Sequence, residues 1–188
     1  MSEESLPPES AGGRVEVVDY DPAWPAQFEA VAGRVRAALG RAALAVEHVG
    51  STSVPGLAAK PVIDANLTVA DSADEAAYAP TLEAAGFRLI VREPNWFEHR
   101  MFKGADPAAN LHVFSEGCPE LSTMRLMRDW LRASPDDLAL YARTKRALAQ
   151  QAWAAVQDYA EAKGEVVAEI LGRARVWASS SSGGSAGG

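Results

Sequence analysis

The sequence predicts an α/β (α+β) fold, in which a mixed sheet core is followed by a helical C-terminal part. Two patterns predict it. Over residues 14–118, short segments with period-two apolar alternation take turns with helical segments. Over residues 119–178, apolar side chains recur at helical spacing only. We therefore expect an α/β core over residues 14–118 and a helical part of the same domain over residues 119–178.

The first elements alternate between strand and helix. A short strand is predicted over residues 15–18, and a helix begins at the prolines around Trp24, because a helix entrance tolerates proline. Strands follow over residues 45–49 and 61–69. In the second of these strands, alternation places Asp64, Asn66 and Thr68 on one face and Ile63, Leu67 and Val69 on the other.

The remaining elements change from strands to helices. An alanine-rich helix is predicted over residues 71–85, ending at Gly86. Strands over residues 87–92, 96–103 and 110–114 are expected to be antiparallel, since their connections are short. One helix is predicted over residues 119–133, and Ser134-Pro135 restarts a helical region that continues to about residue 178.

Charge and composition limit the partners and the cell compartment that we expect for this protein. The chain has 188 residues, a formal net charge of −7 and one cysteine, Cys118. An acidic chain is a poor match for a surface that holds nucleic acid, so we expect no nucleic-acid partner. The lone cysteine excludes an intramolecular disulfide and fits a reducing compartment. The absence of a signal-peptide pattern and of a bilayer-length apolar run predicts a cytoplasmic protein without a membrane partner.

Both ends of the chain are predicted to be disordered. Residues 1–13 combine acids with prolines, and residues 179–188 are serine and glycine with a single alanine. Such segments lack the apolar side chains that would offset the entropy cost of ordering.

A turn rich in glycine and hydroxyl residues carries the strongest functional signal. Gly50 allows a ligand to approach the backbone closely, and Ser51, Thr52 and Ser53 offer hydroxyls beside their N–H groups. Lys60 adds a cation a few residues later. We interpret these five residues as a cradle for the phosphates of a nucleotide.

The spacing around this turn resembles a known signature. Asp64 and Asn66 follow the Gly-Ser pair after twelve residues, which is similar to the nucleotidyltransferase pattern of a Gly-Ser pair and two acidic residues one position apart. Residues 48–61 resemble the GrpB (UPF0157-like) family of predicted nucleotidyltransferase-like proteins more narrowly. The resemblance includes residues 18–25, 99–103 and 111–114 and reaches about residue 171. It implies a nucleotidyltransferase-like mixed sheet core with a C-terminal helical bundle.

Three polar side chains are candidates for the chemistry. Asp64 is predicted to be catalytic and to bind Mg²⁺, because nucleotidyl transfer needs hard oxygen ligands; the alternative is an aspartate that caps the loop. Asn66 is a second candidate metal ligand or a plain polar strand residue, and its neutral amide weakens the case for a two-metal mechanism. His112 lies where the later acidic residue of the core is expected. It would serve as general base, metal ligand or phosphate donor, or only as a packing residue.

Basic side chains are candidates for phosphate binding. Arg100 and Lys103 lie on opposite faces of their predicted strand, and Arg100 suits bidentate phosphate contact. Arg125, Arg128 and Arg132 form a stripe at helical spacing. The stripe is either a solvated face or a lining of the cleft, and in the second case Arg125 and Arg128 are the better phosphate ligands.

A tyrosine and a lysine near the C-terminus complete the candidates. Tyr159 and Lys163 are four residues apart on a predicted helix and resemble a tyrosine-lysine pair of the GrpB family. This resemblance implies stacking or phosphate contact, and ordinary helix-surface packing is the alternative.

Together these residues favour a nucleotidyltransferase-type enzyme. It would use Mg²⁺ and a nucleoside triphosphate to transfer a nucleotidyl group to a small-molecule acceptor. Two alternatives stay open: a noncatalytic module that binds a nucleotide or a phosphorylated metabolite, and an ATP-dependent ligase that activates a carboxylate.

Overall fold

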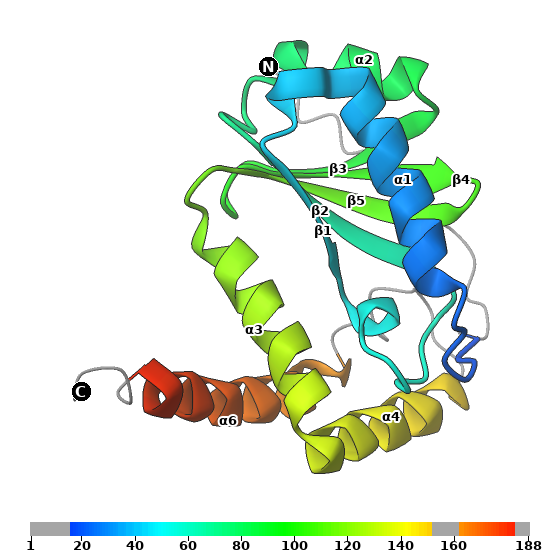
Figure 1. Cartoon of the computed structure of the whole chain (residues 1–188), viewed down its shortest axis with the longest axis vertical. Helices are drawn as coiled ribbons and strands as arrows, with labels where there is room; N and C mark the ends of the chain where they lie inside the picture. Colours follow the sequence, from blue (N-terminus) through cyan, green and yellow to red (C-terminus); the bar gives the residue numbers. More distant parts are fainter. Residues whose placement is uncertain (1–15, 152–161, 183–188) are drawn as a thin grey trace.

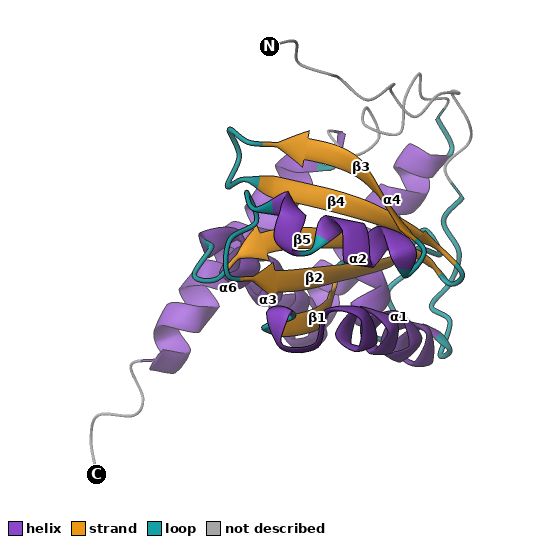
Figure 2. Ribbon diagram, turned by 90° about the horizontal axis from the view of Figure 1, so that it is seen from above, coloured by secondary structure: helices purple, strands orange, loops and turns teal. Residues whose placement is uncertain are grey.

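The computed structural model describes residues 16–151 and 162–182. Its centre is a five-stranded mixed sheet with the strand order β1-β2-β5-β4-β3 (Figure 1). Helices α1 and α2 cover one face of the sheet, and α3 lies against the other (Figure 2). This arrangement confirms the predicted α/β (α+β) class. No helix within the two described ranges combines the length and apolar character needed to cross a membrane.

The strands lie close to the predicted ranges. They are β1 (Ala45–Val49), β2 (Ile63–Val69), β3 (Phe87–Glu93), β4 (His99–Ala105) and β5 (Ala108–Ser115). Strand β2 runs parallel to β5, and the other neighbouring pairs are antiparallel. The predicted antiparallel arrangement of the last three strands is therefore confirmed.

The helices show one clear departure from the prediction. They are α1 (Trp24–Leu39), α2 (Ala79–Ala84), α3 (Pro119–Ala133), α4 (Pro135–Ala149) and α6 (Gly164–Ser182). The helix predicted over residues 71–85 is wrong over its first half, where a single 3₁₀ turn, η3 (Glu75–Ala77), precedes the short α2. Pro80 explains the difference, because proline is tolerated only in the first turn of a helix.

Two terminal predictions also differ from the structure. Of the strand predicted over residues 15–18, the structure describes residues 16–18, and among these only Val18 pairs, in an isolated bridge with Ala59. At the other end, α6 extends to Ser182, into the segment predicted to be disordered. There the hydroxyls of Ser179 and Ser180 donate to carbonyl oxygens one turn earlier in the helix. These bonds satisfy the hydroxyls of serines that composition alone would not place in a helix.

The main apolar core lies between the sheet and helices α1 and α2. Trp24 and Val31 from the helical side meet Leu67, Phe102 and Leu111 from three neighbouring strands. Each of these five side chains is almost completely removed from solvent. Burying a large apolar side chain stabilises a fold by about 1.5–3 kcal/mol, so this face carries most of the hydrophobic stabilisation.

A second, smaller apolar cluster joins the helical part to the loop after β1. Val54 and Leu57 from that loop pack with Leu131 of α3, Ala142 of α4 and Ile170 of α6. Helices α3, α4 and α6 are therefore held against the segment that the sequence marks as a phosphate cradle.

Candidate functional site

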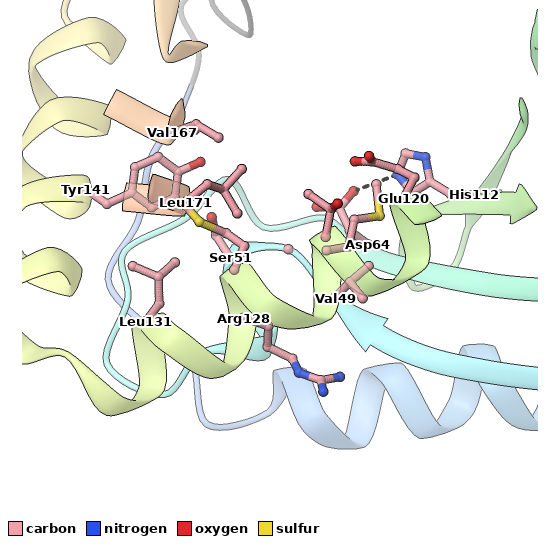
Figure 3. Close-up of a pocket in the computed structure, with 14 residues that line it drawn as sticks. Val49, Ser51, Asp64, His112, Glu120, Arg128, Leu131, Tyr141, Val167 and Leu171 are labelled. Atoms are coloured by element: carbon pink, nitrogen blue, oxygen red, sulfur yellow. Dashed lines mark ion pairs between the residues drawn. The ribbon is translucent and has the colours of Figure 1, made fainter. Parts of the chain in front are cut away.

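A pocket of about 320 Å³ opens between the sheet face that α3 covers and the C-terminal helices. Asp64, His112 and Glu120 lie at one end of it, and Tyr141, Val167 and Leu171 lie at the other (Figure 3). The remaining lining residues are Val49, Gly50, Ser51, Thr123, Met124, Met127, Arg128 and Leu131. The pocket therefore has a charged end on the sheet and an apolar end between helices.

Gly50 and Asp64 fit together closely at the charged end. Gly50 has a φ of +67°, a conformation that other residues rarely adopt. A β-carbon at this position would lie 2.6 Å from Asp64 Oδ2. Only glycine therefore allows the turn to pass directly beside the carboxylate.

The surroundings of Asp64 favour its ionised form. Burial acts to raise the pKa of this carboxyl group. The neighbouring His112 and Asn110 and the positive charge of Lys163 outweigh that effect, so the pKa lies below its ordinary value. Asn110 donates to Asp64 Oδ1 at 2.9 Å. Asp64 therefore brings a negative charge to the pocket at neutral pH.

The three hydroxyls of the cradle have different surroundings. Ser51 lines the pocket, but Thr52 and Ser53 are buried. Thr52 Oγ1 lies 3.0 Å from His48 Nε2, and Ser53 Oγ donates to the carbonyl of Gly50 at 2.6 Å. The structure therefore brings Gly50 and Ser51 to the pocket, whereas the side chains of Thr52 and Ser53 brace the turn.

A buried lysine that the sequence analysis missed contacts the cradle. Lys145 of α4 is 2% exposed, and its ammonium donates to Ser51 Oγ at 2.9 Å and to the carbonyl of Ala58. Its Nζ also lies 4.5 Å from the ring centre of Tyr141. Burial, helped by the positive charge of Lys163, lowers the pKa of Lys145 to about 7.

The helical spacing of α4 indicates that Lys145 lies on the apolar side of the helix. Leu138, Tyr141, Ala142 and Lys145 follow one another at positions i, i+3, i+4 and i+7 of α4. A charged residue in the middle of an apolar helical stripe is rarely buried without a partner or a function.

The two predicted lysines lie in the same electrostatic environment. The pKa of Lys163 is lowered by burial, raised by the charge of Asp64 and lowered by the charge of Lys60. Lys163 is partly buried, while Lys60 is exposed. Lys60, Lys145 and Lys163 therefore contribute positive charge around the cradle, with Lys145 in direct contact with it. Tyr159, the predicted partner of Lys163, lies outside the described residues.

The arginine stripe of α3 holds the helix to the cradle segment. Arg128 donates to the carbonyl of His48 at 3.1 Å, and Arg132 donates to the carbonyl of Ser53 at 2.6 Å. Arg125 lies 3.4 Å from the carboxylate of Glu47. Although Arg128 borders the pocket, its guanidinium points away from the other lining side chains (Figure 3). These contacts favour a structural role for the stripe over the predicted phosphate contact.

The structure separates Arg100 from the other candidates. Arg100 lies on the α1 and α2 face of the sheet, where its Nε is 2.5 Å from Glu75 and its Nη2 is 3.2 Å from Glu98. The expected phosphate contact of Arg100 is therefore not supported, because the sheet lies between it and the pocket. Lys103 pairs with Asn110, which contacts Asp64, and so occupies the pocket face of β4. The predicted opposite orientation of the two basic residues is confirmed.

A chain of hydrogen bonds leads from the pocket to the surface through two histidines. His112 Nδ1 lies 3.1 Å from His99 Nε2, and His99 Nδ1 lies 2.6 Å from Glu93 Oε2. On its other side, His112 Nε2 lies 3.6 Å from Asp64 Oδ1. Burial lowers the pKa of His99 to about 4, against the opposing influence of Glu93. His99 is thus a neutral imidazole at physiological pH.

Asn66 is the least satisfied polar side chain of this sheet face. It is fully buried, and neither its amide oxygen nor its amide nitrogen has a hydrogen-bond partner among the described residues. Its register partners are Glu47 on β1 and His112 on β5. A buried amide without partners is destabilising and calls for an explanation, such as a ligand.

Glu120 adds a second acidic group at the charged end. It stands in the first turn of α3 and lines the pocket together with Asp64. Burial raises the pKa of Glu120. The residues of the described ranges include no group of three or more histidine, cysteine, aspartate or glutamate side chains placed to hold a metal ion by themselves.

The arrangement of the strands and helices is that of the nucleotidyltransferase fold. The chain superposes on GLD-2 from the GLD-2/RNP-8 complex with a TM-score of 0.52 at 12% identity, over 69% of this chain and 55% of that chain. It superposes on the crystal structure of the conserved protein GrpB from Enterococcus faecalis with a TM-score of 0.76 at 29% identity, over 86% of this chain and 99% of that chain.

Sequence comparison identifies the family. The model of the GrpB protein family matches residues 14–173. The UPF0157 protein of Halalkalibacterium halodurans is 57% identical over 160 residues, which cover 85% of this chain and 82% of that protein. The chain therefore belongs to the GrpB family, as the resemblance of its cradle predicts.

Proposed function

We propose that this protein transfers a nucleotidyl group from a nucleoside triphosphate to a small-molecule acceptor. The observation that carries the proposal is the contact of Gly50 and Ser51 with an ionised Asp64 on one side and a buried Lys145 on the other. A carboxylate suited to a metal ion and a cation suited to phosphate thus meet at one turn, in a chain of the nucleotidyltransferase fold.

The residues fit Mg²⁺ that a triphosphate shares. Asp64 offers a carboxylate, and on the same sheet face Asn66 has a buried amide oxygen that finds no partner within the described part of the chain. Magnesium ions in nucleotide sites are held by one or two carboxylates, by water and by phosphate oxygens, so a full set of protein ligands is not required. When bound, the ion would neutralise phosphate charge and make the α-phosphorus more electrophilic.

The chain's own residues would orient the substrates and move a proton. His112 Nε2 would take the proton of the acceptor's nucleophile while that nucleophile forms a bond to the α-phosphorus. The bond from the α-phosphorus to the bridging oxygen breaks, and its electron pair leaves with pyrophosphate. Protonated Lys145, with Lys163 nearby, would neutralise the charge that accumulates on the leaving group. The apolar end of the pocket would exclude water around the bound base or acceptor.

A noncatalytic binding module is the second candidate. Asn66 favours it, because a second carboxylate at this position would help to hold metal ions and the amide contributes no charge. Such a module would keep the cradle and Lys145 and bind a nucleotide or a phosphorylated metabolite without turnover. The ligase alternative has no separate support in the geometry.

Calorimetry separates the two candidates. The purified protein would be titrated with ATP, GTP, CTP and UTP in the presence of Mg²⁺ and again with EDTA. We expect metal-dependent binding of at least one nucleotide. Equal affinity with and without the ion would favour the module, and no binding of any nucleotide would refute the proposed activity.

Two matched variants make the test specific. Asp64→Asn keeps the size of the side chain and removes its charge, so it should abolish the metal dependence of nucleotide binding. Asp71→Asn changes an exposed residue just beyond the far end of the same strand and should leave binding unchanged. Asn66→Asp should tighten metal binding if both side chains share an ion, whereas unchanged metal affinity would remove Asn66 from the site.

A further inference from the structure

The charges on the pocket face of the sheet are arranged by sign along the strands. Asp64, Asn110 and Lys103 pair across β2, β5 and β4, in the row of this face that lies nearest to the cradle. His112 follows two residues further along β5. Lys145 contacts the cradle itself. The basic side chains Lys103 and Lys145 therefore both lie on the cradle side of His112, where a triphosphate would need them.

Helix α3 brings an acidic residue to the other end of this face, the distal end, which lies away from the cradle. The helix contacts the cradle near its own last turn, where Arg132 donates to the carbonyl of Ser53. Glu120 stands in the first turn of α3, about 18 Å from Arg132 along the helix axis at about 1.5 Å per residue. Figure 3 shows Glu120 at the same end of the pocket as His112. Glu120 therefore adds a negative charge at the distal end.

The carboxylate of Glu120 lines the pocket without a partner in the described part of the chain. No hydrogen bond or ion pair joins it to another described residue. Its place in the first helical turn is favourable for the helix dipole. A half-buried carboxylate nevertheless loses part of its hydration, and a cation that enters the pocket would compensate for that loss.

Exposed aromatic rings lie at the distal end as well. The turn between β3 and β4 presents Trp96 and Phe97, which are 40% and 46% exposed. The Trp96 ring meets the edge of Phe114 with 5.8 Å between ring centres, and Phe114 lies two residues beyond His112 on β5. Phe97 and Glu98 have φ values of +55° and +51°, which residues other than glycine rarely adopt. The turn therefore holds two large rings in solvent through an unfavourable backbone conformation.

We propose that the acceptor is a small amine that also carries a hydroxyl, with its ammonium bound by Glu120 and the ring of Trp96 as an aromatic surface at the same end. This inference rests on the proposed function. A carboxylate and the face of an aromatic ring are the two side-chain surfaces that attract an organic cation. Glu93, which is 48% exposed and ends β3, adds negative charge at the distal end. The triphosphate and the amine would thus approach Asp64 from ends of opposite charge.

The ammonium is the group that is recognised, and the hydroxyl is the nucleophile, because a protonated nitrogen has no lone pair. The hydroxyl oxygen forms the bond to the α-phosphorus, and its proton passes to His112 as in the proposed function. Pyrophosphate leaves with the electron pair of the broken bond. A hydroxy acid would bring its negative charge against Glu120, so we expect amines to be preferred to neutral alcohols and neutral alcohols to hydroxy acids.

Three small acceptors of similar size measure this preference. Ethanolamine, ethylene glycol and glycolate share a hydroxymethyl group and differ in the charge of the other end, which is positive, neutral or negative. Pyrophosphate release would be followed with Mg²⁺ and the nucleotide that binds in the calorimetric titration. We expect kcat/KM to be about tenfold higher for ethanolamine than for ethylene glycol, the effect of one charge-assisted contact. Equal values, or a preference for glycolate, would overturn the inference.

A pair of matched variants tests the role of Glu120. Glu120→Gln should reduce the ratio of kcat/KM for ethanolamine to that for ethylene glycol about tenfold. Glu83→Gln, an exposed change on α2 over the opposite face of the sheet, should leave the ratio unchanged. The ratio compares two acceptors on one variant, so a smaller amount of folded protein does not alter it. An unchanged ratio in Glu120→Gln would refute the role of Glu120, and a weakened response to Mg²⁺ with an unchanged ratio would assign Glu120 to the metal instead.

Trp96 offers a second test with its own control. Trp96→Leu should reduce the same ratio about two- to fivefold, as expected for a cation beside an exposed ring. Trp177→Leu is the control, because Trp177 is 37% exposed and packs on Trp130 in the helical part. Equal ratios in the two variants would remove Trp96 from the acceptor site.

Binding without turnover separates this inference from the proposed function. The ¹H–¹⁵N signal of the Trp96 indole, assigned with Trp96→Leu, would be followed while ethanolamine or ethylene glycol is added, with and without the nucleotide. We expect a shift with ethanolamine only, weakened in Glu120→Gln. Such a shift in a protein that binds no nucleotide would keep the amine site and refute the transfer. Metal-dependent nucleotide binding without any shift would keep the proposed function and overturn the amine site.

Discussion

The two faces of the sheet carry opposite chemistry, although the same strands build both. Toward α1 and α2, strands β2 and β5 present Ala65, Leu67 and Leu111, all fully buried in one apolar cluster. Toward α3, the alternating positions present Asp64 and His112 to a pocket. Side chains of successive strand residues point to opposite faces, so a shift of register by one residue would exchange core and site.

The two faces differ in their role: one stabilises the fold, and the other has the features of a functional site. The core face gains free energy by burying apolar surface, and each of its residues is replaceable only by one of similar volume. The pocket face contains the amide of Asn66, which has no hydrogen-bond partner among the described residues, and a carboxylate pressed against a glycine. Close to it lies Lys145 of α4, whose pKa is lowered. Such features cost stability, and proteins keep them mainly at functional sites.

The largest expected difference in the free energy of unfolding is between two substitutions, one on each face of the sheet. Phe102→Ala removes a fully buried ring from the core and should lower the free energy of unfolding by about 3–5 kcal/mol. Asn66→Leu replaces the unsatisfied amide with an apolar group of similar size and should keep stability within about 1 kcal/mol of the wild type or raise it. Urea denaturation measures both. A loss for Asn66→Leu as large as that for Phe102→Ala would contradict the contrast.

A second comparison tests the close approach at the cradle. Gly50→Ala meets backbone strain of about 1–3 kcal/mol at positive φ and, in addition, a clash with Asp64. Gly56 has a φ of +79°, and a β-carbon added there would meet no atom of the described residues within 4 Å other than those of its chain neighbours, so Gly56→Ala carries the strain alone. We expect Gly50→Ala to be the less stable variant in urea and to lose nucleotide binding. Equal stability of the two variants would show that the contact with Asp64 is not tight.

The lowered pKa of Lys145 predicts a pH dependence of stability. An unfolded lysine has a pKa of about 10.4, whereas that of folded Lys145 is about 7. Between these values the unfolded chain binds more protons than the native protein, so stability should rise with pH over this range. Lys145→Met should reduce that rise, and Lys60→Met, an exposed control, should not. Urea denaturation at several pH values compares the slopes, and equal slopes for wild type and Lys145→Met would disprove the burial effect.

The smallest expected effect concerns the arginine stripe. Arg132→Ala removes the hydrogen bonds to the carbonyl of Ser53, and its side chain is 44% exposed. We expect a loss of about 1 kcal/mol in the free energy of unfolding, because a hydrogen bond from a partly solvated group contributes little net stability. Arg143→Ala on the exposed side of α4 is the control. A loss of nucleotide affinity without a loss of stability would instead assign Arg132 to the pocket.

Much of the fold could be predicted from local patterns. The bounds of β1 and α3 agree with the predicted ranges, because a change of hydrophobic period or a proline marks each boundary. Pro80 was the signal that the prediction of a long helix over residues 71–85 overlooked. Among the site candidates, the period-two rule placed Asp64 and Asn66 together and separated Arg100 from Lys103.

The sequence by itself determined the five strands of the sheet, their two faces and the glycine turn of the cradle, since these follow from neighbours a few residues apart. Only the tertiary structure decided that Lys145 reaches Ser51 and that Glu93, His99 and His112 lie in one chain of hydrogen bonds. Lys145 and Ser51 are 94 positions apart in the chain, and their contact depends on how α4 packs against the cradle. Local periodicity carries no information on such packing, because it is set by the shapes of surfaces that meet only in the folded chain.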